Sequence, residues 1–167
     1  MSMKRLLTIG LAGLALLATA YLTLGRAGIQ ETGSAGLFMP DDEETVALGR
    51  ELYASNCAAC HGDNLEGQVA DWRLPGPEGL MPAPPHDETG HTWHHPDQVL
   101  FEITKFGIVA AANLKDYRTA MPIYEGVLSD EEIIAVLSFI KGTWPEEIRA
   151  GHDEMNARYA LEPPETR

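Results

Sequence analysis

The only two cysteines of this 167-residue chain lie three positions apart, at Cys57 and Cys60, and His61 follows them directly. These residue types at this spacing allow four chemistries: a disulfide, a redox-active dithiol, part of a zinc site, or covalent attachment of a haem. Each of the four requires a different setting in the rest of the chain. The elements around the motif therefore decide among them.

An uncharged apolar stretch, LLTIGLAGLALLATAYLTLG, follows Lys4 and Arg5 and extends over residues 6–25. Twenty helical residues span about 30 Å, the thickness of the hydrocarbon core of a bilayer. The basic residues before the stretch predict a cytoplasmic N-terminus and export of the remainder. Residues 1–25 are therefore predicted to be a membrane anchor that crosses the bilayer at residues 6–24, or a signal peptide cleaved after Ala20. The length of the apolar run favours the anchor.

The exported part of the chain is strongly acidic. All 25 acidic residues lie beyond position 20, whereas Lys4 and Arg5, two of the 12 basic residues, precede it; the formal charge of the whole chain is −13. Nucleic acids require a basic surface, so we expect no nucleic-acid partner. An acidic domain instead favours protein partners with a basic docking face.

The pattern of the chain beyond the apolar stretch predicts a flexible linker at residues 26–40, a folded domain at 41–144 and a helical extension at 145–167. Helical patterns occur at residues 41–56, 97–106 and 108–117. The strongest helix signal is at 129–142, where Ser129 and Glu132 form a capping box and the apolar residues recur at helical spacing. No strand pattern is present, so the predicted fold class is all-α.

The all-α setting distinguishes among the four chemistries of the cysteine motif. A disulfide between Cys57 and Cys60 would close a very small loop and stabilise little. A thioredoxin-like dithiol expects strands and helices in alternation, and zinc needs further thiolates or well-spaced histidines. Covalent c-type haem fits an exported helical domain, with both thiols added to the haem and His61 on its iron. A haem would also fill the core that the irregular, proline-rich residues 62–96 leave thin.

The second axial ligand of such an iron decides its chemistry. Met81 and Met121 are the candidates, because the other methionines lie near the N-terminus, in the linker or in the terminal helix. Met121 precedes the capped helix, where the chain can return across the face opposite His61, so we expect Met121 to be the ligand and Met81 to pack. A histidine–methionine iron is typical of an electron carrier, whereas an open position would mean ligand binding or peroxide reduction.

Further predictions concern the surroundings of the motif. His61 is expected to direct its other ring nitrogen to a backbone carbonyl at Pro82 or Pro84. Haem edges or propionates are possible partners, with ordinary packing as the alternative, for four residues: Trp72, Arg73, His91 and Trp93. A second metal site is a weaker hypothesis for the histidine-rich loop at residues 86–95, which holds His86, His91, His94 and His95 with Asp87 and Glu88.

The stretch CAACHG, followed by AMPIYEGVLSDEEIIAVLSFIKGTWP, resembles class I c-type cytochromes over about residues 41–144. In that family the CXXCH motif attaches the haem and supplies the proximal histidine, which implies these roles for Cys57, Cys60 and His61. The methionine of a Met-Pro pair before the last core helix supplies the distal ligand, which implies Met121.

The resemblance also implies the packing of two helices. A glycine and an aromatic residue of the first helix cross the last core helix, which places Gly49 and Tyr53 near Phe139. The stretch PAPPHDETGHTWHHPDQVLFEITKFG is longer and richer in histidine than the minimal family pattern, and it resembles a bacterial subgroup of small monohaem cytochromes. The helix after Trp144 is an extension beyond the family core.

From these features we expect a one-electron carrier with one covalent haem c, and not an enzyme. The expected location is the bacterial cytoplasmic membrane, with a single span and the haem domain in the periplasm, or the soluble periplasm after cleavage. The expected partners are a quinol–cytochrome c oxidoreductase, a dehydrogenase or a terminal oxidase. The alternatives are a haem protein with an open distal position and a metallochaperone that uses the histidine-rich loop.

Overall fold

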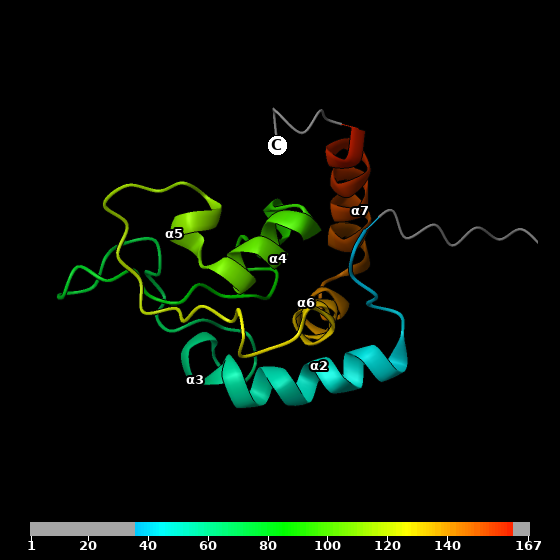
Figure 1. Cartoon of the computed structure of the whole chain (residues 1–167), viewed down its shortest axis with the longest axis horizontal. Helices are drawn as coiled ribbons and strands as arrows, with labels where there is room; N and C mark the ends of the chain where they lie inside the picture. The colour runs from blue at the N-terminus through cyan, green and yellow to red at the C-terminus, as the bar shows by residue number, and fades with distance from the viewer. Residues whose placement is uncertain (1–35, 162–167) are drawn as a thin grey trace, which may run out of the picture. The chain divides into compact units, whose positions relative to one another are not determined.

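The computed structural model describes residues 36–161, which are drawn in colour in Figure 1. The predicted anchor or signal peptide at residues 1–25 and most of the predicted linker lie outside this range. Within residues 36–161 no helix is both long and apolar enough to cross a membrane. The described residues contain helices and loops but no strand, only isolated bridges such as Met81–Thr119. The all-α prediction is confirmed.

The first described helix, α2, spans Glu43–Asn56 and leads directly into the cysteine motif. Its N-terminus is capped by Asp42, whose carboxylate accepts from the Thr45 backbone N–H at 2.8 Å, and two glutamates in the first turn suit the helix dipole. The Cys57 N–H still bonds the Tyr53 carbonyl at 2.8 Å. The short helix α3, Ala58–His61, follows at once.

Helix α6, Asp130–Gly142, crosses α2 and forms the centre of the core (Figure 1). Its predicted capping box is present: the Ser129 hydroxyl accepts from the Glu132 N–H at 3.2 Å, and the Glu132 carboxylate accepts from the Ser129 N–H at 2.8 Å. At the crossing, a Cβ on Gly49 would overlap the Ala135 carbonyl. The Tyr53 and Phe139 rings lie 5.5 Å apart, so the predicted crossing of the two helices is confirmed.

Helices α4, Asp97–Phe106, and α5, Ile108–Ala111, lie between the histidine-rich loop and the Met121 loop. The bounds of α4 agree with the predicted helix at residues 97–106. The second pattern, predicted over residues 108–117, forms only one helical turn. Asn113 and Asp116 adopt left-handed backbone angles, with φ of 46° and 61°, and this conformation stops the helix.

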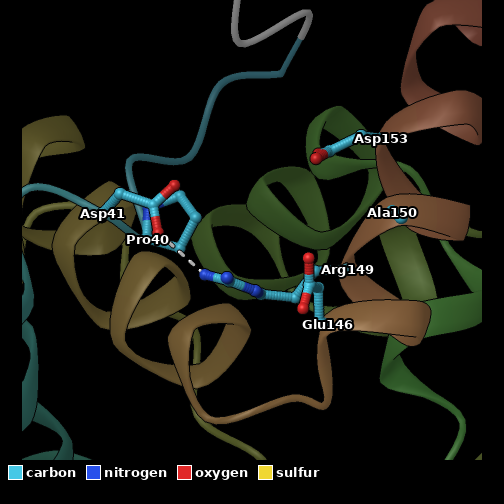
Figure 2. A pocket seen from close by; sticks show the side chains of 6 residues that line it. All are labelled: Pro40, Asp41, Glu146, Arg149, Ala150 and Asp153. Carbon is cyan, nitrogen blue, oxygen red and sulfur yellow. Dashed lines mark hydrogen bonds and ion pairs between the residues drawn. The ribbon is translucent and has the colours of Figure 1, made fainter. Parts of the chain in front are cut away.

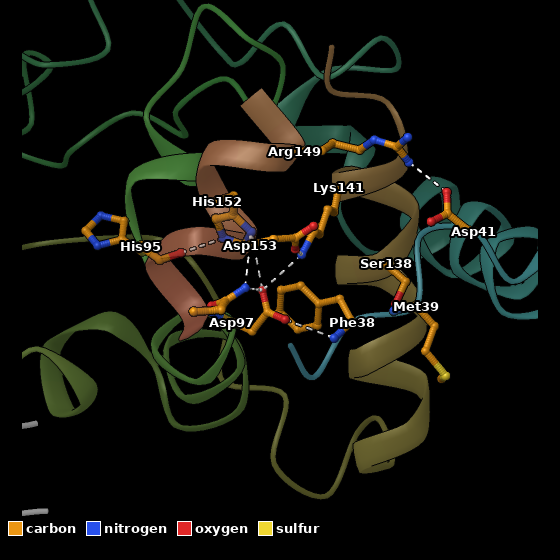
Figure 3. Close-up of polar contacts among 11 residues, drawn as sticks. Phe38, Met39, Asp41, His95, Asp97, Ser138, Lys141, Arg149, His152 and Asp153 are labelled. Atoms are coloured by element: carbon orange, nitrogen blue, oxygen red, sulfur yellow. Dashed lines mark hydrogen bonds and ion pairs between the residues drawn. The ribbon is translucent and has the colours of Figure 1, made fainter. Parts of the chain in front are cut away.

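The C-terminal helix α7, Glu146–Leu161, follows α6 after a short turn (Figure 1) and forms the described part of the helical extension predicted at residues 145–167. Its two buried side chains, His152 and Asn156, are polar, and polar contacts hold the helix (Figure 3) in addition to the packing of Ile148 on the core. The buried Asn156 amide both accepts from the Asp97 N–H at 2.8 Å and donates to the Asp97 carboxylate at 2.9 Å. The buried His152 bonds the His95 carbonyl at 2.9 Å, and Lys141 of α6 reaches Asp153 at 2.6 Å.

Residues 62–96 follow the cysteine motif as a long loop whose only helical piece is the 3-10 turn η1, Thr92–His94. The loop doubles back on itself, because residues 65–68 bind residues 83–86. The Gln68 N–H donates to the Ala83 carbonyl at 2.9 Å, and the His86 N–H donates to the Leu65 carbonyl at 2.8 Å. This return brings the segment Pro84–His86 beside the residues that directly follow the motif.

Candidate haem site

The cysteine motif forms a single tight turn. The His61 and Cys60 N–H groups both bond the Cys57 carbonyl, at 2.9 and 3.1 Å. Both thiols are free, with Cys57 half-buried and Cys60 exposed, whereas the His61 ring is buried. One turn of the chain thus presents two available thiols and one buried imidazole.

Two tyrosines fix the backbone on either side of this turn. The Tyr124 hydroxyl donates to the Asn56 carbonyl at 2.6 Å, and the Tyr53 hydroxyl donates to the Gly62 carbonyl at 2.8 Å. Burial raises the pKa of Tyr124 to about 12, so its hydroxyl stays protonated and remains a donor. Sequence reasoning did not single out Tyr124, because nothing in the pattern relates position 124 to position 56.

The Cys57 thiol lacks the electrostatics of a redox-active cysteine. Burial raises the pKa of the Cys57 thiol to about 11, the opposite of the lowering that activates catalytic thiols. A protonated, half-buried thiol is a poor nucleophile for disulfide exchange. The redox-dithiol alternative therefore has no support in the local environment.

His61 is oriented for metal binding. Its Nδ1 lies 2.9 Å from the Pro84 carbonyl, which confirms the predicted backbone acceptor and selects Pro84 over Pro82. A carbonyl only accepts, so Nδ1 carries the hydrogen and Nε2 keeps its lone pair. Burial lowers the pKa of His61, and the neutral ring is the form that binds a metal.

The ring of His86 lies flat against that of His61, with centroids 4.0 Å apart and planes 19° from parallel. Its Nδ1 is 2.8 Å from the Thr92 hydroxyl. Burial, followed by the neighbouring His61 and His91, lowers the pKa of His86 well below its ordinary value. Sequence analysis placed His86 only in a histidine-rich cluster, because this contact depends on how the loop folds back.

The other histidines of residues 86–95 do not converge on one point. His91 stacks on Trp72 with centroids 4.8 Å apart, and His94 stacks on Trp93 at 3.7 Å. Within residues 36–161 no group of three or more His, Cys, Asp or Glu side chains is placed to hold a metal ion. Neither zinc at the cysteine motif nor a second metal in the histidine-rich loop has the ligands it needs among these residues.

The loop that carries Met121 runs beside the loop that carries Met81. The Met81 N–H donates to the Arg118 carbonyl at 2.8 Å, and Met81 pairs with Thr119. The Met121 N–H donates to the Thr119 hydroxyl at 3.0 Å, which fixes the turn before Pro122. Both methionines are half-buried, and the choice of Met121 as the iron ligand stays a prediction.

The family model of cytochrome c matches residues 46–144, more than half of the chain and the whole region between α2 and Trp144. The chain belongs to the cytochrome c family. The cytochrome is also 39% identical, over 61 residues, to the cytochrome c subunit of the cytochrome bc1 complex of Corynebacterium efficiens. That match covers 36% of this chain and 18% of the relative, so the chain spans less than a fifth of the relative's length. No solved structure matches the cytochrome.

Members of this family carry covalent c-type haem, and the described residues of the cytochrome fit that group. His91 Nδ1 and Trp93 Nε1 are buried and, among residues 36–161, have no hydrogen-bond partner. A buried polar group without a partner costs about 1–3 kcal/mol, so such groups usually face an acceptor. Haem carries two carboxylates, and Arg73, 4.0 Å above the Trp72 ring, adds a positive charge next to the His91 stack.

A separate pocket of the cytochrome lies away from the cysteine motif, between the residues before α2 and the start of α7 (Figure 2). Its volume of about 220 Å³ is below the roughly 300–1,000 Å³ of ordinary ligand pockets. The Arg149 guanidinium pairs with the Asp41 carboxylate across it at 2.8 Å. None of the residues that line this pocket belongs to the cysteine motif or to the histidine-rich loop.

Proposed function

We propose that the cytochrome is a one-electron carrier whose haem is attached through Cys57 and Cys60 and held between His61 and Met121. When bound, the haem iron supplies the reversible ferric–ferrous change. The observation that supports this assignment is the buried, neutral His61, whose Nδ1 is held by Pro84 directly after two free thiols. In this proposal the cytochrome makes and breaks no substrate bond and is therefore not an enzyme.

The protein's own residues do three things in this proposal. Pro84 fixes the tautomer of His61 and leaves Nε2 available. Tyr53 and Tyr124 hold the turn that carries the cysteines. The loop at residues 62–96 covers the buried His61 ring with His86, and exclusion of water from an iron ligand together with a thioether ligand raises a haem potential.

The test compares Met121→Ala with the matched control Met81→Ala in the haem-loaded protein. We expect Met121→Ala to abolish the methionine-to-ferric-iron absorption band and to lower the midpoint potential, because thioether ligation stabilises the reduced iron. We expect Met81→Ala to change neither. Loss of the band in Met81→Ala alone would reverse the assignment of the ligand.

The wild-type protein distinguishes the runner-up function by the same measurement. If the ferric wild-type protein shows no methionine band and binds cyanide rapidly, or the ferrous protein binds carbon monoxide rapidly, the distal position is open. The cytochrome would then be a ligand-binding or peroxide-reducing haem protein. Haem that dissolves in acidified organic solvent would contradict attachment through Cys57 and Cys60.

We also propose that the partners are membrane or periplasmic redox complexes and that the chain is held at the bacterial cytoplasmic membrane by residues 6–24. The similarity to a protein named as a bc1 complex subunit supports a quinol–cytochrome c oxidoreductase as one partner. The acidic composition supports docking on basic surfaces. Stopped-flow electron transfer with such a complex should slow as salt rises, and an unchanged rate would argue against electrostatic docking.

Mass spectrometry of the membrane-purified protein distinguishes a retained membrane anchor from a signal peptide cleaved after Ala20.

A further inference from the structure

The ring of His86 covers one face of the ring of His61. Their centroids are 4.0 Å apart and the planes differ by 19°, so the two imidazoles are in stacking contact. The Tyr53 ring also packs edge-on against His86, with ring centroids 6.5 Å apart and planes at 72°. His61 therefore meets a flat, aromatic wall rather than a flexible aliphatic side chain.

His86 is itself held at three points. Its Nδ1 lies 2.8 Å from the hydroxyl of the buried Thr92, which in turn donates to the Pro85 carbonyl at 3.4 Å. The His86 ring and the Thr92 hydroxyl are in hydrogen-bond contact, with donor and acceptor set by the tautomer of His86. The His86 backbone donates to Leu65 at 2.8 Å and accepts from the Trp144 indole at 2.7 Å.

These contacts complement the bond between His61 and Pro84. A single hydrogen bond at Nδ1 fixes one edge of the His61 ring but leaves the ring free to rock about that edge. A rigid ring stacked on its face removes this remaining freedom. The plane of a ligating imidazole sets its overlap with the iron orbitals, and groups around a ligand tune the metal through such orientation.

We propose that His86 is a positioning residue for the haem ligand: its ring fixes the plane of the His61 ring, and the Thr92 hydroxyl fixes the ring of His86. The proposal rests on the assignment of His61 as the axial ligand under the proposed function. It assigns to the histidine-rich loop a role in ligand geometry.

The test uses the full-length, haem-loaded protein with four variants: His86→Leu, His86→Phe, Thr92→Val and Thr89→Val. The readouts are the electron paramagnetic resonance spectrum of the ferric protein and the hyperfine-shifted haem methyl signals in proton NMR. Both report the orientation of the axial ligands rather than the stability of the fold. Thr89→Val is the matched control, since the exposed Thr89 bonds only Asp87.

We expect His86→Leu to shift the haem methyl signals and broaden the low-spin resonance, because the His61 ring then samples a range of planes. His86→Phe keeps the aromatic face and should restore most of the wild-type pattern. Thr92→Val should shift the signals in the same direction as His86→Leu but less, and Thr89→Val should leave them unchanged. If His86→Leu yields no haem-loaded protein, the shift of the haem methyl signals in Thr92→Val tests the proposal instead.

Wild-type spectra for His86→Leu, or equal shifts for the Leu and Phe variants, would overturn the inference while the proposed function stands. So would a Thr92→Val spectrum identical to that of Thr89→Val. A failure of the proposed function looks different. It is a wild-type ferric protein without a low-spin signal, in which case His61 is not held on iron with Met121 and the inference falls with it.

Discussion

At the scale of single residues, the site is prepared by hydrogen bonds that hold backbone and rings in place. The Pro84 carbonyl accepts a hydrogen bond from His61 Nδ1–H. The hydroxyls of Tyr53 and Tyr124 donate to carbonyls on either side of the cysteine turn. Each bond alone is modest, about 0.5–1.5 kcal/mol net. Together they remove the local freedom that a covalently attached, axially ligated haem would otherwise have to restrict.

The Tyr124 hydroxyl offers a direct measure of this restraint. Tyr124→Phe removes the donor to Asn56 and keeps the ring, so we expect the free energy of unfolding to fall by about 1–2 kcal/mol. The measurement is denaturant unfolding of the haem-loaded protein. Tyr117→Phe is the control, because the hydroxyl of the half-buried Tyr117 makes no hydrogen bond within residues 36–161. An equal loss in both variants would show that the Asn56 bond is not responsible.

At the scale of helices, two different kinds of packing hold the fold. The crossing of α2 and α6 is a close apolar approach, made possible because Gly49 has no side chain where the Ala135 carbonyl lies. The docking of α7 depends on buried polar groups, with Asn156 bonded twice to Asp97. Close packing tolerates little added volume, and buried polar contacts tolerate little loss of a partner.

A glycine-to-alanine substitution should have opposite effects on stability at the helix crossing and on the open face of α7. Gly49→Ala forces α2 and α6 apart, so we expect a loss of about 1–3 kcal/mol in the free energy of unfolding. Gly151 lies in α7 with open space around it, and Gly151→Ala should stabilise by about 0.5–1 kcal/mol through helix propensity. Thermal unfolding measures both. Neutral behaviour of Gly49→Ala would contradict the close approach.

The docking of α7 should depend on pH through His152. This ring faces Asp97 of α4, Lys141 of α6 and Asp153 of its own helix, and burial lowers its pKa. The unfolded value is about 6.5, so as the pH falls the unfolded chain binds the proton first. The contribution of neutral His152 is present above about pH 6.5 and is lost as the pH falls toward the folded-state pKa.

A comparison of the wild type with His152→Gln tests this dependence. The glutamine amide is expected to keep a donor to the His95 carbonyl and cannot titrate. We expect the melting temperature of the variant to fall less steeply between pH 7 and pH 5 than that of the wild type. Parallel curves would exclude His152 as a source of the acid sensitivity.

At the scale of the whole molecule, the protein-only core is unevenly distributed. It centres on the crossing of α2 and α6 and includes the buried rings of Phe38 and Trp144. The loops contribute much less, and Leu74, Ile123 and Val127 are each more than half exposed. A small domain with so little loop burial is marginal without a further hydrophobic group at its centre.

The haem-free chain should therefore lose most of its stability. The double variant Cys57→Ala, Cys60→Ala cannot form the thioether bonds, and we expect it to show little helix and no cooperative thermal transition by circular dichroism. Met121→Ala, which keeps both cysteines, is the control and should still unfold cooperatively. A cooperative transition in the double variant without haem would contradict the prediction.

The features that the sequence predicted correctly depend on residues that are close together in the chain. The bounds of α4 and the capping box of α6 follow from short-range signals: a proline, a serine three residues before a glutamate, and apolar residues at helical spacing. The cysteine motif and the need of His61 for a carbonyl partner follow from the chemistry of the residue types. The helix predicted at residues 108–117 is wrong beyond its first turn. The spacing of apolar residues still allowed a helix there, but the backbone at Asn113 is left-handed and ends it.

The sequence by itself thus determined the helical class, the family and the motif at Cys57–His61, since these depend on neighbours in the chain. The tertiary structure alone decided that His86 stacks on His61 and that Tyr124 reaches Asn56. It also decided that His91 and Trp93 each bury a ring nitrogen that has no hydrogen-bond partner among residues 36–161. The two contacts join residues that are 25 and 68 positions apart in the sequence. The two buried nitrogens are atoms with which a bound haem would pair. The reason is that they depend on the path of a long loop, whose course no periodic pattern fixes.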